Sequence, residues 1–141
     1  MTYRFTFDPK RKLIRVVQDG LENVHSALEV MREVRMHPEF HADYGILCDF
    51  RKGAFPRSKI ELVKVSEVIK VFFPGQRIAL TYSDPEREKG GNFVAASTGT
   101  VTSIRVFNDP EAAEAWLSSP STTLPVVDRS KASGPPDAND G

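Results

Sequence analysis

The 141-residue sequence has few of the features that mark a secreted, membrane-spanning or nucleic-acid-binding chain. Its one cysteine, Cys48, excludes an internal disulfide framework and a cysteine-rich zinc site, and fits a reducing compartment. There is no excess of charge, because 19 basic residues balance 19 acidic ones, so no overall field attracts nucleic acid or anionic lipid. No apolar run approaches the roughly 18 residues of a membrane span. We therefore expect a soluble cytoplasmic protein that does not bind nucleic acid.

What the sequence does contain is enough apolar material for one folded core. Hydrophobic residues make up 40% of the chain and charged residues 27%, as in an ordinary globular domain. The last stretch, residues 120–141, differs because it holds four of the ten prolines and no aromatic residue. Such a segment cannot bury enough apolar surface to offset the entropy of ordering it. We expect one domain at residues 1–119 and a flexible tail rich in proline, serine and aspartate at residues 120–141.

The body of the chain alternates between two hydrophobic periods. Residues 3–8 and 13–17 alternate apolar and polar side chains around a turn, which predicts a β-hairpin. Short, nearly continuous apolar runs at 44–50 and 77–82 predict strands covered on both faces, and 103–107 predicts a final strand. Apolar residues at three- and four-residue steps predict amphipathic helices that begin near residues 21, 58, 84 and 109.

Capping signals fix where several of these helices begin and end. Residues 58–61 have the reciprocal pattern in which Ser58 and Glu61 cap each other's backbone, and this second helix should end before Pro74. An aspartate followed by proline opens the last two helices at Asp84 and Asp109. Residues 51–57 should form a loop, and Gly90-Gly91 should weaken the third helix. The order β-β-α-β-α-β-α-β-α predicts an α/β fold: a five-stranded mixed sheet, mostly parallel with the first strand antiparallel, and four helices.

With this order in place, residues 3–119 resemble a SpoIIAA-like (STAS-like) domain. The resemblance rests on the opening hairpin, Ile46-Leu47-Cys48-Asp49, Arg77-Ile78-Ala79-Leu80, and a final strand followed by an acid-capped helix with Trp116-Leu117. It implies a superhelix of β-α units with the strands in sequential order. It also implies a relationship in fold to anti-sigma-factor antagonists, which act by protein–protein contact, and to Sec14-type lipid carriers. In the antagonists a phosphorylatable serine caps the helix after the third strand, a position that Ser58 occupies here.

Charged residues gather around the predicted start of the second helix. Asp49 ends a buried strand, Ser58 begins the helix, and Arg51, Lys52 and Arg57 lie between them. Backbone N–H groups at a helix start favour an anion, so these five residues form a candidate anion or phospho-switch site. The alternative is that Ser58 is an ordinary cap and the basic side chains are solvated.

The second helix has two apolar faces with different candidate roles. One broad stripe should cover the sheet, and it consists of Leu62, Val65, Val68, Ile69, Phe72 and Phe73. The opposite side carries a candidate partner face, made of Ile60, Val63, Lys64 and Val71. Val65, Ile69, Phe72 and Phe73, together with Phe93 of the third helix, are candidate walls of an apolar-ligand cleft. Scattered exposed apolar residues are ordinary, so the outer face has a purely structural alternative.

No signature of catalysis, metal binding or a cofactor stands out. His37 and His41 flank Pro38, which prevents the helical spacing that metal ligands prefer, so we expect an exposed loop with Phe40 turned inward. Cys48 lies within a strand, where a small buried thiol is the default. We expect no catalytic residue, no metal and no cofactor.

Two functions remain open from the sequence. The first is a non-enzymatic regulatory or protein-binding module that uses the second helix and the loop before it, with self-association into a homodimer left open. The alternative is binding of an apolar ligand or lipid in a cleft beside the second helix, with association at a membrane surface. A long apolar cavity beneath Val65, Ile69, Phe72 and Phe93 would favour the lipid. A filled core and an exposed helix face would favour the protein partner.

Overall fold

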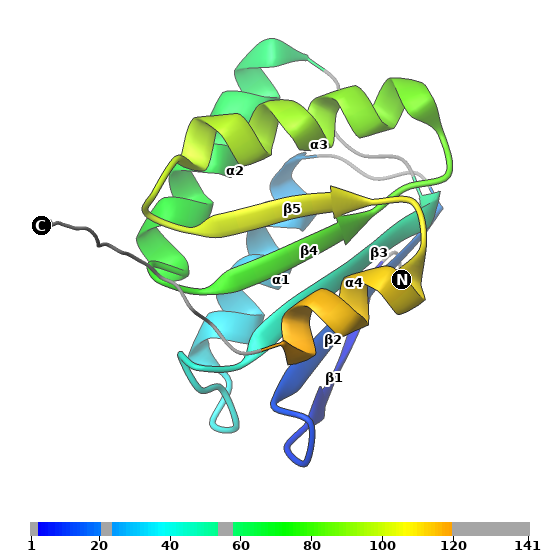
Figure 1. Ribbon diagram of the computed structural model, residues 1–141. Coiled ribbons are helices and arrows are strands. Elements are labelled where there is room, and N and C mark those ends of the chain that lie inside the picture. Colours follow the sequence, from blue (N-terminus) through cyan, green and yellow to red (C-terminus); the bar gives the residue numbers. More distant parts are fainter. Residues whose placement is uncertain (1–2, 21–23, 54–57, 120–141) are drawn as a thin grey trace, which may run out of the picture.

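The computed structural model describes residues 3–20, 24–53 and 58–119, and shows an α/β domain (Figure 1). Arg57 and the predicted tail, residues 120–141, lie outside the described residues. The elements in chain order are β1 (Tyr3–Asp8), β2 (Leu13–Gly20), α1 (Val24–Met36), β3 (Gly45–Gly53), α2 (Lys59–Phe72), β4 (Arg77–Thr81), α3 (Pro85–Thr98), β5 (Ser103–Phe107) and α4 (Pro110–Ser118).

The strands form a single five-stranded sheet in the order β1-β2-β3-β4-β5. β1 pairs with β2 antiparallel, and every later pair is parallel. Helices alternate with the parallel strands because each parallel connection must cross from one end of the sheet to the other. The predicted fold class, strand order and element order are confirmed.

Helices cover the sheet unequally on its two faces. On one face α1, α2 and α3 pack over the main core, and on the other face lies the short α4 (Figure 1). Alternate residues of each strand supply the two layers, so Ile46 and Ile78 point into the main core while Leu47 and Ala79 contact α4 through Ala113.

Two strands are longer than the sequence predicted. We expected β2 to end before Asp19-Gly20 and residues 51–57 to form a loop, of which residues 54–57 lie outside the described residues. Instead the register shifts between Val17 and Asp19, after which Asp19 pairs with Lys52 and Gly20 with Gly53. This irregularity lets the pairing of β2 with β3 continue beyond their apolar residues. The sequence did not predict it, because the alternation of apolar and polar residues does not reveal a shift in strand register. Arg51 and Lys52 are therefore strand residues.

α2 begins and ends where its capping pattern predicts. The Ser58 hydroxyl oxygen accepts a hydrogen bond from the Glu61 N–H at 3.1 Å, and the Ser58 N–H donates to the Glu61 carboxylate at 3.4 Å. Of the predicted core stripe, four residues are buried, namely Leu62, Val65, Ile69 and Phe73. Val68 and Phe72 are only half-buried. This corrects the expected stripe: α2 packs between α1 and α3, so its flanks meet neighbouring helices and not the sheet.

Trp116 packs α4 against the other face of the sheet. Its ring lies 5.8 Å from that of Phe107, measured between centroids. The guanidinium carbons of Arg77 and Arg105 lie 4.8 Å and 5.5 Å from the centroid of the same ring. Trp116 thus stacks with cations from two neighbouring strands, an arrangement that is favourable because the face of an indole is electron-rich.

Candidate functional site

Asp49 and Arg51 meet at the carboxyl edge of the sheet. The Arg51 guanidinium donates to both carboxylate oxygens of Asp49 at 2.9 Å, and the Arg51 N–H donates to Asp49 Oδ1 at 3.1 Å. The Thr81 hydroxyl lies 3.4 Å from the same oxygen. The Arg51 hydrogen bonds, opposed by partial burial, lower the pKa of Asp49 below its ordinary value. The carboxylate is thus ionised and held by its neighbours, which is a structural arrangement and not that of a general acid.

The other members of the candidate anion site are less closely joined. Ser58 is exposed, and its hydroxyl caps α2 as described above. Lys52 is an exposed strand residue, and Arg57 lies outside the described residues. Within the described part of the chain, no ion pair or hydrogen bond links Ser58 to Arg51 or Lys52. The structure therefore brings Asp49 and Arg51 together, and whether the five residues bind an anion stays a prediction.

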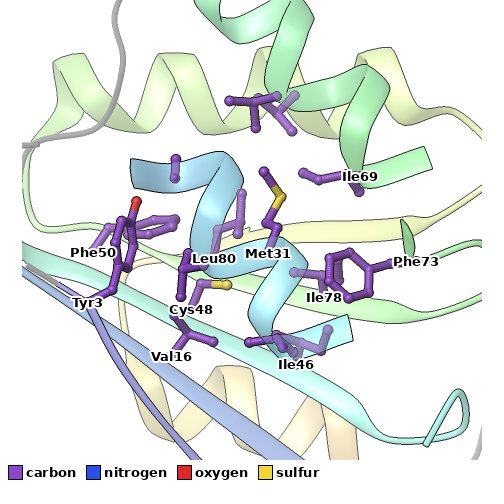
Figure 2. Close-up of a pocket in the computed structure, with 15 residues that line it drawn as sticks. Tyr3, Val16, Met31, Ile46, Cys48, Phe50, Ile69, Phe73, Ile78 and Leu80 are labelled. Carbon is purple, nitrogen blue, oxygen red and sulfur yellow. The ribbon is translucent and has the colours of Figure 1, made fainter. Parts of the chain in front are cut away.

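An apolar cavity of about 60 Å³ lies between the sheet and the three helices that cover it (Figure 2). It is lined by strand residues, Tyr3, Val16, Ile46, Cys48, Phe50, Ile78 and Leu80, and by Ala27, Val30, Met31, Val34, Val65, Ile69, Phe73 and Val94. Three residues of the predicted apolar cleft, Val65, Ile69 and Phe73, are among them. Phe72 and Phe93 are half-buried and do not line it.

The size of this cavity limits what it can hold as it stands. A dry apolar cavity of about 150 Å³ accepts one benzene molecule, so about 60 Å³ is too small for a lipid chain. The thiol of Cys48 borders the cavity, where burial and then the charge of Asp49 raise its pKa to about 12. A thiol with that pKa stays protonated at neutral pH and is a poor nucleophile.

The outer side of α2 exposes apolar residues to solvent. Ile60, Val63 and Val71 are 74%, 42% and 73% exposed, and the Lys64 side chain lies among them. Five large apolar residues are exposed in the described part of the chain, and the other two are Met36 and Val101. The predicted partner face is therefore a real surface feature, with most of the exposed large apolar side chains on one helix.

The loop after α1 contains the two histidines that the sequence singled out. The His37 ring stacks on Phe7, with 4.6 Å between centroids, and its Nδ1 accepts the Glu39 N–H at 3.1 Å. Phe40 packs half-buried against the core. Among residues 3–20, 24–53 and 58–119, no group of three or more histidine, cysteine or acidic residues is placed to hold a metal.

A second hollow at the amino edge of the sheet was not expected. It is an open groove of about 860 Å³ between the β1–β2 turn, the loops before β3 and β4, and the end of α4. The buried Gln76 shapes its floor, because its amide donates to the carbonyl oxygen of Tyr44 at 3.0 Å. Three loops and a helix end converge here only in three dimensions, so the sequence carries no local signal for it.

Taken with the fold, these features define an α/β domain whose five strands lie in sequential order and whose second helix exposes three large apolar residues. No family model matches the chain, and no curated protein sequence matches it. A solved structure with a similar fold is that of an uncharacterized DUF3478-family protein with a SpoIIAA-like fold from Shewanella loihica PV-4. The two chains are 16% identical, and the match covers 82% of this chain and 91% of the other, with a TM-score of 0.54.

This protein therefore has a SpoIIAA-like fold, as the sequence predicted. At this level of identity the likeness establishes the fold and nothing about activity or partners. No helix among the described residues is both long and apolar enough to cross a membrane.

Proposed function

We propose that this protein is a non-enzymatic binding module that holds a partner protein on the outer side of α2. The observation that carries the proposal is the exposure of Ile60, Val63 and Val71 on one helix. Single exposed apolar residues are normal on a protein surface, whereas three on the outer side of one helix, with a cation among them, favour a contact surface. Lys64 adds a charge that can select among partners.

The chemistry of the carboxyl edge supports a binding role over a catalytic one. Arg51 holds Asp49 ionised, and burial keeps the Cys48 thiol protonated. General acid–base catalysis needs a group whose pKa lies near the working pH, and these two groups are displaced away from it. Neither Asp49 nor Cys48 therefore has a pKa suited to general acid–base catalysis.

Ser58 gives this module a place for regulation. It lies at the start of the same helix that carries the partner face, and it is exposed. A phosphate there would lie at the amino end of α2, where the positive end of the helix dipole favours negative charge. We propose that modification of Ser58 adds charge beside Ile60 and so changes how the partner binds.

Two variants with matched exposure test the partner face. Val63 on α2 and Val101 before β5 are both 42% exposed, so Val63→Gln and Val101→Gln change apolar surface by similar amounts. Immobilised full-length protein is mixed with extract from the source cells, and the bound proteins are compared by quantitative mass spectrometry. The proposal predicts a protein that is retained by the wild type and by Val101→Gln but lost from Val63→Gln. Equal retention by all three would contradict it.

Binding of an apolar ligand is a second candidate, favoured by the apolar lining of the cavity beneath α2. Because the cavity is only about 60 Å³, a lipid chain could enter only if α2 moved away from the sheet. The candidate predicts that organic extracts of the purified protein contain stoichiometric lipid, and that fatty acid raises the melting temperature. A lipid-free extract without a thermal shift contradicts it. Sedimentation with vesicles of anionic phospholipid tests association at a membrane surface separately.

A further inference from the structure

The outer side of α2 is self-complementary about the middle of the helix. The midpoint between Val65 and Ser66 lies equally far from Ile60 and Val71, and equally far from Lys64 and Glu67. At 3.6 residues per turn, these four positions lie on one side of the helix, opposite the buried Leu62 and Ile69. All four are exposed. An apolar residue therefore stands at each end of the surface, with one cation and one anion between them.

This arrangement has a simple consequence for two copies of the chain. In an antiparallel pair of α2 helices related by a twofold axis at the midpoint, each residue faces its equidistant counterpart. Ile60 of one copy then faces Val71 of the other, and Lys64 faces Glu67. Symmetry repeats both contacts, so the interface contains two apolar contacts and two ion pairs of opposite charge, without a like-charge clash at either position.

We propose that the outer side of α2 joins two copies of this protein as an antiparallel, symmetric dimer. The inference rests on the proposed use of the same face and names its partner as a second copy. Ile60 and Val71 supply the apolar contact, and the two Lys64–Glu67 pairs set the antiparallel register.

The charged residues are available for this role. Among the described residues, Lys64 has no ion-pair partner. Glu67 pairs with Lys70 on its own helix at 2.9 Å, yet its side chain is 63% exposed, so the carboxylate can accept a second cation. A second copy can reach the outer side of α2, because α1 and α3 contact only the flanks of this helix.

The size of the surface predicts a weak and salt-sensitive dimer. From residue 60 to residue 71 the helix rises about 16 Å, at about 1.5 Å per residue. One helix pair of that length buries less than the roughly 1,600 Å² of a standard stable interface. Exposed ion pairs are also screened by salt over a distance of about 10 Å at 0.1 M. The dimer should therefore form at high protein concentration and low ionic strength.

Charge reversal at the centre of the interface is the decisive test. In a Lys64→Glu homodimer, a glutamate at position 64 faces Glu67 of the other copy at both symmetry-related contacts. In a Glu67→Lys homodimer, lysines face each other at the same two contacts. Each variant alone should therefore associate at least about tenfold more weakly than the wild type. A one-to-one mixture of the two variants restores both opposite-charge pairs and should recover association as a heterodimer. Lys89→Glu, an exposed reversal on α3, is the control and should associate like the wild type. Sedimentation equilibrium of the full chain in 20 mM and 500 mM salt measures each case.

The outcomes separate this inference from the proposed function. Loss of association in each single variant, with recovery in the mixture, establishes the dimer even if one variant is slightly less stable. A wild type that stays monomeric, or single variants that associate normally, overturns it. In either of those cases the comparison of Val63→Gln with Val101→Gln still decides whether a different protein binds the same face.

Discussion

The ring of Tyr82 lies directly against the backbone of Gly91, so that a Cβ at Gly91 would stand 2.5 Å from Cε2 of the tyrosine. Tyr82 follows β4 and is almost fully buried, and its ring also packs on Phe50 at 5.4 Å between centroids. Burial is the main reason that the pKa of the Tyr82 hydroxyl is raised far above its ordinary value. Glycine at position 91 therefore sets how closely α3 approaches the carboxyl edge of the sheet.

This contact predicts different effects of alanine substitution at two adjacent glycines. Gly91→Ala should lower the free energy of unfolding by about 1–3 kcal/mol, because the added methyl group overlaps the buried Tyr82 ring. Gly90→Ala is the control, since its Cβ would lie 3.5 Å from a Leu62 methyl group, which is ordinary contact. That variant should be neutral or more stable by up to about 1 kcal/mol, because alanine favours helix. Urea unfolding followed by circular dichroism compares them, and equal destabilisation would contradict the packing argument.

These two glycines also show how far the sequence alone could lead. Because glycine has a low helix propensity, the sequence predicts that Gly90-Gly91 weakens the third helix, yet α3 is continuous from Pro85 to Thr98. The reason for Gly91 lies in Tyr82, which belongs to another element and becomes its neighbour only after folding. Periodicity and caps predicted the order and type of every helix and strand because those signals are local, while close approaches between elements are not.

The candidate site was predictable to a similar extent. The sequence singled out Asp49 and Arg51 as members of one site but placed Arg51 in a loop. Residues two apart in a strand have side chains on the same face of the sheet. Asp49 and Arg51 can therefore pair because β3 continues to Gly53, which the sequence did not predict. The cavity depends in the same way on the rotation of α2, which decides that Phe73 lines it and Phe72 does not.

Asp49 should contribute to stability in a pH-dependent manner. Its pKa is lowered in the folded state, so its contribution is fully present above the ordinary carboxyl pKa near 4 and is lost as the pH falls through the lowered value. Asp49→Asn should therefore cost about 1 kcal/mol at pH 7, a figure kept small because Arg51 is partly exposed. The difference from wild type should shrink below pH 4 in urea titrations.

A second aspartate provides the matched control for that experiment. Asp43 pairs with Lys12 at 3.6 Å, and both side chains are well exposed. Asp43→Asn should leave the free energy of unfolding unchanged across the same pH range, since exposed pairs contribute little. A loss equal to that of Asp49→Asn would show that the effect is one of net charge and not of the Asp49–Arg51 contact.

Cys48 should resist thiol reagents while the protein is folded. With a pKa of about 12 it has far less thiolate at pH 8 than a free cysteine, so its reaction with a disulfide reagent should be at least about a hundredfold slower than in denaturant. Because the folded pKa is raised, the thiol contributes stability below the unfolded pKa near 9, and this contribution is lost as the pH rises toward 12. Rapid labelling of the native protein at pH 8 would contradict this prediction.

Arg77 should hold α4 on the sheet, and the single tryptophan reports on it. The Arg77 guanidinium donates to the Ser119 carbonyl oxygen at 2.8 Å and to the Trp116 carbonyl oxygen, while it stacks on the Trp116 ring. Arg77→Gln removes these contacts together, and should cost about 1–2 kcal/mol and shift the tryptophan emission to longer wavelength. Arg105→Gln is the control, because Arg105 is exposed and its guanidinium lies farther from the ring, at 5.5 Å. Arg105→Gln should change the emission and the iodide quenching of Trp116 far less than Arg77→Gln does. An equal change in both variants would contradict the prediction, because it would mean that stacking on Trp116 holds α4 without the Arg77 hydrogen bonds.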